Sequence, residues 1–251
     1  MKPGEWWDIT ANAFRGCSHA SPGCDNCWAE RMAWRLRHNP KREIASMYEP
    51  TVEAARWTGK TTYDPYWALG LPNGPKRRRV FFNGMGDMFH EANRPSDVQD
   101  CMEQMRAFKH LLFIVATKRP ETAVYHLRIH NQPMTNMILL SSVEDQAALD
   151  ARLQYTLDCK AYVGAIGLSV EPMLGPLNIT NVELRRLDWV ICGGETGHMA
   201  RGMRPAWAEA LLCDCQQAKT PFFFKQWGKL HPGRRILLDE PSEGPELWRT
   251  F

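Results

Sequence analysis

The sequence lacks the apolar segments that direct a chain into or across a membrane. No hydrophobic run approaches the ~20 residues that a spanning helix needs. The amino-terminal stretch MKPGEWWDIT contains no apolar core of the kind found in secretory signals. We therefore expect a cytoplasmic protein without a membrane partner, in a compartment where cysteines stay reduced.

The chain also lacks a strong excess of charge of either sign. Its 31 Lys and Arg residues and 28 Asp and Glu residues leave a net charge of +3, which permits a nucleic-acid partner without demanding one. Basic residues are concentrated in one run, Lys76–Arg79. We interpret this run as a solvated loop, with a patch that contacts phosphates as the alternative.

Cysteine is not scarce, because the chain has eight. Reduced surroundings make metal ligands and buried small side chains better interpretations than disulfides. Three cysteines occur close together in GCSHASPGCDNCWAE, with the spacing C-x6-C-x2-C: Cys17, Cys24 and Cys27. We assign the other five to the core: Cys101, Cys159, Cys192, Cys213 and Cys215.

Three clustered thiolates favour one kind of metal centre over another. A structural zinc site uses four ligands, so zinc stays a candidate only because His19 could be the fourth. A [4Fe–4S] cluster suits three thiolates better, because they hold three irons and leave the fourth free to bind a small molecule. In the first loop of an α/β barrel, such a cluster is typical of a radical S-adenosylmethionine enzyme.

Short β-branched or aromatic runs alternate with helical stretches such as Asp97–Lys109 and Ala206–Ala218. This alternation predicts an α/β fold whose parallel strands are covered by helices on both sides. Six or seven units would form a partial or closed (β/α)6–7 barrel, and a doubly wound sheet is the alternative. The expected strands are Val80–Asn83, Leu112–Ala116, Met137–Ser141, Val163–Val170, Trp189–Cys192 and Pro221–Lys225, with a weaker one near Trp6–Thr10.

One domain is expected over residues 1–251, with an insertion at about 39–79 that is rich in Pro, Gly and aromatic residues and ends in the basic run. Polar side chains follow six successive strands at their carboxyl ends, which is the face that holds active sites in parallel α/β barrels. Helix capping accounts for a single such residue but not readily for all of them. They are Asn83, Asp87, Thr117, Lys118, Ser142, Glu144, Glu171, Glu195, Lys225 and Gln226.

Seven motifs occur in order along nearly the whole chain: GCSHASPGCDNCWAERMA, FFNGMGDMFHE, TKRPE, SSVEDQ, SVEPMLGP, DWVICGGETG with RGMRP, and FFFKQWG. On these motifs the chain resembles the phage Gp37/Gp68-like family, which has no established function and is related to radical S-adenosylmethionine enzymes. The resemblance implies a radical S-adenosylmethionine barrel with two cofactors, a [4Fe–4S] cluster and S-adenosyl-L-methionine. It also implies an external electron donor.

The resemblance suggests a role for each polar position. We expect the cluster on Cys17, Cys24 and Cys27, and catalysis by Lys225, Glu195 and Glu171. We expect S-adenosylmethionine to bind to Trp28, Asn83, Gly84, Asp87, Thr117, Ser142, Glu144, Gly193 and Gly194. We expect the substrate to bind to Lys118, Arg201, Arg204 and Gln226.

The phage setting of the resembled family points to DNA hypermodification in the host-cell cytoplasm. The specific expectation is a monomeric isomerase that acts on an amino-acid-modified thymine in DNA, reached by base flipping. A free nucleoside or amino acid would suit the same basic residues. Two other hypotheses stay open: a zinc-stabilised protein that binds nucleic acid or a partner without catalysis, and a barrel enzyme without a cluster.

Overall fold

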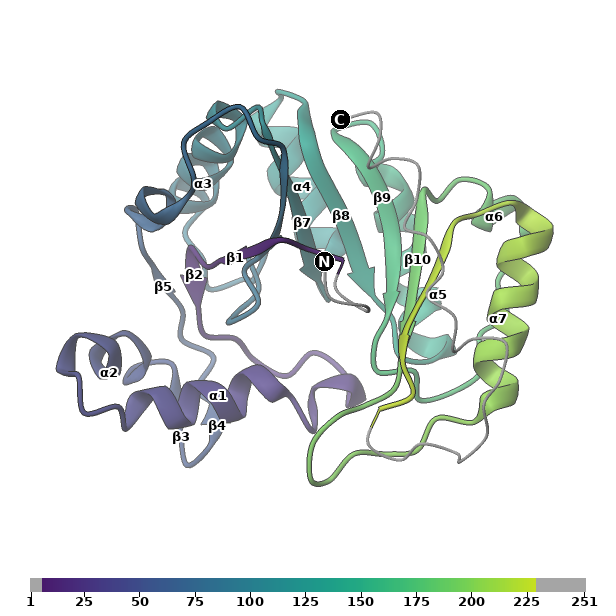
Figure 1. Cartoon of the computed structure of the whole chain (residues 1–251), viewed down its shortest axis with the longest axis horizontal. Helices are drawn as coiled ribbons and strands as arrows, with labels where there is room; N and C mark the ends of the chain where they lie inside the picture. Colours follow the sequence, from purple (N-terminus) through teal and green to yellow (C-terminus); the bar gives the residue numbers. More distant parts are fainter. Residues whose placement is uncertain (1–5, 229–251) are drawn as a thin grey trace.

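The computed structural model describes residues 6–228. Its main sheet has seven strands in the order β1-β6-β7-β8-β9-β10-β11, and every neighbouring pair is parallel. The strands curl into a half-barrel (Figure 1). They are β1 (Ile9–Ala11), β6 (Arg78–Phe82), β7 (Leu111–Thr117), β8 (Met134–Ser142), β9 (Val163–Val170), β10 (Trp189–Gly193) and β11 (Phe222–Gln226).

The strand order confirms the predicted parallel α/β barrel and shows that it is the partial form, not the closed one. Within the described residues, the outer strands β1 and β11 do not pair with each other, so the barrel stays open. The strands follow one another across the sheet in chain order, without the reversal that a doubly wound sheet requires. The doubly wound alternative is therefore wrong.

Alternate strand residues build two separate apolar cores. One face of β7, β8 and β10 packs around Trp6 and Trp189 on the inside of the half-barrel. The other face packs against the covering helices in a larger core that includes Phe113 and Leu139. At Gly167 in β9, a Cβ would lie only 2.2 Å from the carbonyl oxygen of Trp189, so glycine allows β9 and β10 to approach.

The covering helices connect successive strands and begin with recognisable signals. Proline occupies the first turn of α3, α4 and α7, where its missing N–H costs nothing. The Asp145 side chain caps α5 by accepting a hydrogen bond from Ala148 N. These helices are α3 (Pro95–Ala107), α4 (Pro120–His130), α5 (Gln146–Cys159), α6 (Asn181–Leu184) and α7 (Pro205–Ala218).

The long connection between β1 and β6 carries the cysteine loop and several short elements. The two-residue strand β3 pairs with β4 and β2 pairs with β5, each antiparallel. The elements are β2 (Phe14–Arg15), η1 (Pro22–Cys24), α1 (Trp28–Arg37), α2 (Arg42–Tyr48), β3 (Val52–Glu53), β4 (Arg56–Trp57), β5 (Thr62–Tyr63) and η2 (Trp67–Gly70). The basic run is divided, because Arg78 and Arg79 belong to β6 and not to a loop.

In the described part of the chain, no helix combines the length and apolar character needed to cross a membrane.

Candidate functional site

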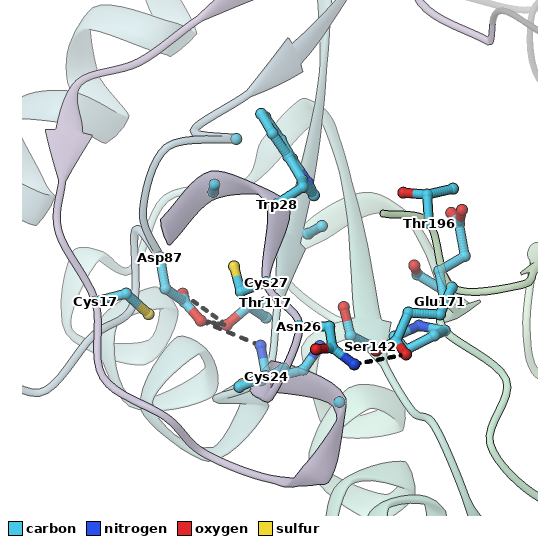
Figure 2. A pocket seen from close by; sticks show the side chains of 18 of the residues that line it. Cys17, Cys24, Asn26, Cys27, Trp28, Asp87, Thr117, Ser142, Glu171 and Thr196 are labelled. Atoms are coloured by element: carbon cyan, nitrogen blue, oxygen red, sulfur yellow. Dashed lines mark hydrogen bonds between the residues drawn. The ribbon is translucent and has the colours of Figure 1, made fainter. Parts of the chain in front are cut away.

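A cavity of about 260 Å³ opens at the carboxyl ends of the parallel strands. In Figure 1, the strands β8 and β9 point toward this end of the molecule, where α1 and the cysteine loop lie. All three clustered cysteines line the cavity, together with residues at or just after the carboxyl ends of β6, β7, β8, β9, β10 and β11. Figure 2 shows Cys17 and Asp87 on one side and Glu171 and Thr196 on the other.

Fifteen of the residues expected in the site line this cavity. They are Cys17, Cys24, Cys27, Trp28, Asn83, Gly84, Asp87, Thr117, Lys118, Ser142, Glu171, Gly194, Glu195, Lys225 and Gln226. The cavity therefore gathers residues that are up to two hundred positions apart in the sequence, as the carboxyl-end rule for parallel strands predicts.

The cysteine loop is held at the cavity by close backbone contacts. Gly16 forms a bridge to Gly86, and at its φ of 95° a Cβ would meet the carbonyl oxygen of Lys60 at 2.2 Å. Gly23 N lies 3.4 Å from Glu144 Oε1, which ties η1 to the end of β8. Cys27 immediately precedes α1, and its N–H donates to Cys24 O at 3.1 Å.

Arg119 connects the first cysteine to the ends of β6 and β7. Its guanidinium lies 3.6 Å from Cys17 Sγ and 3.3 Å from Asp87 Oδ2. It also donates to Glu91 at 2.9 Å and to Ser18 Oγ at 2.8 Å. Only 4% of the side chain is exposed, so these contacts satisfy a buried charge.

Burial favours the protonated form of two of the three thiols, those of Cys17 and Cys27. Burial and the Asp87 charge raise the pKa of Cys17 to about 12, although the Arg119 charge acts in the opposite direction. Burial also raises the pKa of Cys27. A bound metal would displace these protons, because thiolate is the ligand form of cysteine.

Three cysteines at one cavity are a donor set that an iron–sulfur cluster can use. No group of three or more His, Cys, Asp or Glu side chains among residues 6–228 is placed to hold one ion. His19, which could be the fourth ligand of a zinc site, pairs with Glu30 at 3.0 Å. His126 and His130 have an HxxxH spacing on α4 and join no third ligand in this part of the chain. In a cluster each thiolate holds a different iron, so the sulfurs need not converge on one point.

Asn83 provides an unused hydrogen-bond donor at the cavity. It ends β6 with a left-handed φ of 64° and is 2% exposed. Its Oδ1 accepts from Phe14 N at 2.7 Å, whereas its buried Nδ2 has no partner among the described residues. A buried donor without a partner costs free energy unless a ligand accepts from it.

Asp87 lines the cavity and is held by several contacts within the protein. Its carboxylate accepts from Thr117 Oγ1 at 2.8 Å, from Lys118 N at 3.1 Å and from the Arg119 guanidinium. It also accepts from Phe89 N at 3.0 Å. These contacts fix the polar end of β7 against the loop that follows β6.

On the opposite wall, Lys225 and Glu171 form an ion pair of 2.7 Å between Nζ and Oε2. The Lys225 ammonium also lies 5.8 Å from the ring centroid of Trp6 and 5.9 Å from that of Trp7. Gly193 does not line the cavity, but a Cβ there would meet Glu171 Oε2 at 2.9 Å. Its role is to leave room for the Glu171 carboxylate.

Glu195 links the cysteine loop to the segment after β10. It accepts from Asn26 Nδ2 at 2.9 Å and from Arg201 through Nη2 at 2.6 Å. Burial acts to raise the pKa of Glu195, but the Arg201 and Asn26 hydrogen bonds outweigh it and hold that pKa below its ordinary value. The carboxylate is therefore charged at neutral pH.

Three more expected ligands lie outside the cavity lining. Glu144 is fully buried and pairs with Arg152 at 3.1 Å, so it supports β8 and η1 instead of facing a cofactor. Arg201 is engaged by Glu195 and by Asp25 at 3.2 Å. Arg204 is exposed at the start of α7, where its guanidinium lies over the Trp207 ring.

Several lining residues were not expected from the sequence. Trp6, Trp57 and Phe81 give the cavity aromatic walls, and Asn26 and Thr196 add polar atoms. The sequence does not identify these aromatic residues as cavity residues, because aromatic side chains usually pack in the core.

Comparisons with known proteins assign the chain to a family but do not assign a reaction to it. A family profile described as "Protein of unknown function (DUF5131)" matches residues 3–247, and it does not carry the phage Gp37/Gp68 name. No curated protein matches the chain. A solved chain described as "Spore photoproduct lyase complexed with dinucleoside spore photoproduct" is 11% identical, with a TM-score of 0.47. That match covers 90% of this chain and 62% of the solved one.

Proposed function

We propose that this chain, which belongs to the DUF5131 family, is a radical S-adenosylmethionine enzyme that holds a [4Fe–4S] cluster on Cys17, Cys24 and Cys27. The observation that carries this proposal is the placement of all three cysteines in one cavity at the carboxyl end of a parallel half-barrel. When bound together, the cluster and S-adenosylmethionine supply a 5′-deoxyadenosyl radical that abstracts hydrogen from a substrate. The chain's own residues bind, orient and shield the reacting groups.

Two features of the cavity suit the second cofactor. The unpaired Nδ2 of Asn83 can donate to a carboxylate such as that of the methionine moiety. Trp28 and Phe81 lie beside Gly84, where a Cβ would be 2.9 Å from the Phe81 ring and 3.6 Å from that of Trp28. These aromatic walls offer a stacking surface for adenine. Asp87 positions Thr117, Lys118 and Arg119 and is not assigned to the cofactor.

The opposite wall suggests the substrate class. Lys225 and Glu171 present opposite charges side by side against Trp6 and Trp7. An amino-acid group has the same two charges, so its carboxylate can pair with the Lys225 ammonium and its ammonium can pair with the Glu171 carboxylate. The finer proposal is therefore isomerisation of an amino-acid-modified thymine, with an external electron donor. A hydrogen removed and returned leaves the composition of the substrate unchanged.

Metal analysis tests the cluster against zinc. Protein reconstituted without oxygen should contain iron and sulfide and show a broad absorption band at about 400 nm. Replacing Cys17, Cys24 or Cys27 with Ala should abolish iron retention. The controls are Cys101→Ala, a buried position, and Cys213→Ala, an exposed one. Colourless protein that holds zinc, or equal iron loss from both sets, would contradict the proposal.

A second experiment separates the cofactor from the substrate assignment. In Lys225→Gln, S-adenosylmethionine should still be cleaved without substrate, because Lys225 lies on the wall away from the cysteines. Conversion of a thymine nucleoside that carries an amino-acid group should fall. If Lys225→Gln converts that nucleoside at the normal rate, the zwitterion assignment is wrong while the radical chemistry stands.

A further inference from the structure

A second cavity, of about 770 Å³, lies at the amino ends of the strands, opposite the first. Its lining comes from the start of β6, the carboxyl end of α3, the α3–β7 connection and the start of β8. In Figure 1 this is the upper edge of β7 and β8, and the cysteine loop lies beyond their lower ends. The five residues of β6 alone separate the edges by about 15 Å.

Positive charge predominates in this second cavity. Among residues 6–228, five cationic side chains and one carboxylate, that of Asp8, line it, which leaves a balance of five minus one, or +4. The whole chain has a net charge of +3, so the rest of the molecule is close to neutral. The cations are Arg77, Arg78, Arg79, Arg106 and Lys109.

The Asp8 carboxylate already pairs with one of these cations. Asp8 accepts from Arg79 through N at 2.7 Å and through Nε and Nη2 at 3.1 Å each. Within residues 6–228, the other four cations of the cavity have no carboxylate within ion-pair distance. Arg106 also lies in the last turn of α3, where a cation offsets the helix dipole. That explanation does not apply to Arg77 or Arg78, which come from a different segment.

We propose that this cavity, the amino-edge basic site, binds the phosphate backbone of a nucleic acid. Its uncompensated cations come from separate segments around a hollow, which matches a chain of phosphates better than a single anion. Arginine is the side chain best suited to phosphate. The site cannot belong to the cysteine cavity, because it lies at the other end of the sheet. It therefore acts as an independent anchor for the polymer.

Fluorescence anisotropy with a labelled DNA of about 20 nucleotides, as single strand and as duplex, tests the proposal. The test variant is Arg77→Gln/Lys109→Gln, which removes two charges from exposed positions of the site. The control is Arg185→Gln/Arg186→Gln, which removes two charges from exposed positions elsewhere. Both keep the fold, because none of the four side chains is buried.

Between about 50 and 200 mM salt, the test variant should lose affinity relative to the control. Its slope of log K against log salt should be smaller by about 1.8 for duplex DNA, because each lost phosphate contact removes about 0.9. Cys24→Ala should bind normally, which separates this result from the fate of the cluster. Equal slopes for both variants would overturn the proposal. Binding of inorganic phosphate or a mononucleotide as tightly as DNA would also overturn it, in favour of a small-anion site.

Discussion

At the scale of single residues, Arg119 is one of the contacts between the cysteine loop and the rest of the site. It places a positive charge 3.6 Å from Cys17 Sγ while it satisfies Asp87 and Glu91. Charges and hydrogen bonds beside cluster sulfurs set the reduction potential of iron–sulfur centres. We therefore assign Arg119 a positioning role at Cys17.

Arg119→Gln should lower the reduction potential of the loaded centre by roughly tens of millivolts, because it removes a cation that favours the reduced form. Arg119→Lys, which keeps the charge, should recover most of the shift. Arg128→Gln, an exposed position on α4, serves as the control. Electron paramagnetic resonance during a redox titration gives the potentials. Identical potentials in all four proteins would show that Arg119 is only structural.

Glu195→Gln tests whether the link between Asn26 and Arg201 is structural. The folded-state pKa of Glu195 is depressed, so its stabilisation is complete above the unfolded pKa, about 4.3, and is lost as pH falls through the folded pKa. The variant should melt below the unchanged protein at pH 7, and the gap should close in acid. Glu209→Gln, exposed on α7, should show no gap. A gap that is constant with pH would contradict the assignment.

At the scale of elements, the apolar runs predicted the strands β6 to β11, because buried parallel strands are continuously apolar. The first strand, β1, was expected only weakly, near Trp6–Thr10, and it is short and partly exposed. The two-residue strands between β1 and β6 were not predicted. Strands of two residues, such as β3 and β4, have no periodicity to detect. The prediction that the whole basic run is a loop was wrong for a related reason. Arg78 and Arg79 are strand residues at the end of the sheet, where charged side chains reach solvent.

Gly194 allows the ends of β10 and β11 to approach each other closely. A Cβ at Gly194 would lie 1.9 Å from the carbonyl oxygen of Trp227, a backbone atom that cannot move away cheaply. Gly194→Ala should lower the free energy of unfolding by about 2–4 kcal/mol. At Gly175 a Cβ would meet only Asp145 Cβ at 3.6 Å, so Gly175→Ala should be nearly neutral. Denaturant unfolding measures both, and equal losses would contradict the packing argument.

At the scale of the whole molecule, the half-barrel separates two chemically distinct ends. The cysteine cavity lies at the carboxyl ends of the strands and the amino-edge basic site at the other. The rule that site residues lie at the carboxyl ends of parallel strands predicted many of the residues that line the cysteine cavity, including Glu171 and Lys225. It did not predict that Glu144 and Arg201 would be used by internal ion pairs, because pairing depends on side-chain directions that spacing does not reveal.

The most direct test of the central claim is the formation of 5′-deoxyadenosine. Reconstituted protein, S-adenosylmethionine and a strong reductant are incubated without oxygen, and the product is quantified by mass spectrometry. We expect 5′-deoxyadenosine from the unchanged protein and from Cys213→Ala, and none from Cys24→Ala. Absence of cleavage by protein shown to be fully loaded with iron and sulfide would contradict the claim that this cavity performs radical S-adenosylmethionine chemistry.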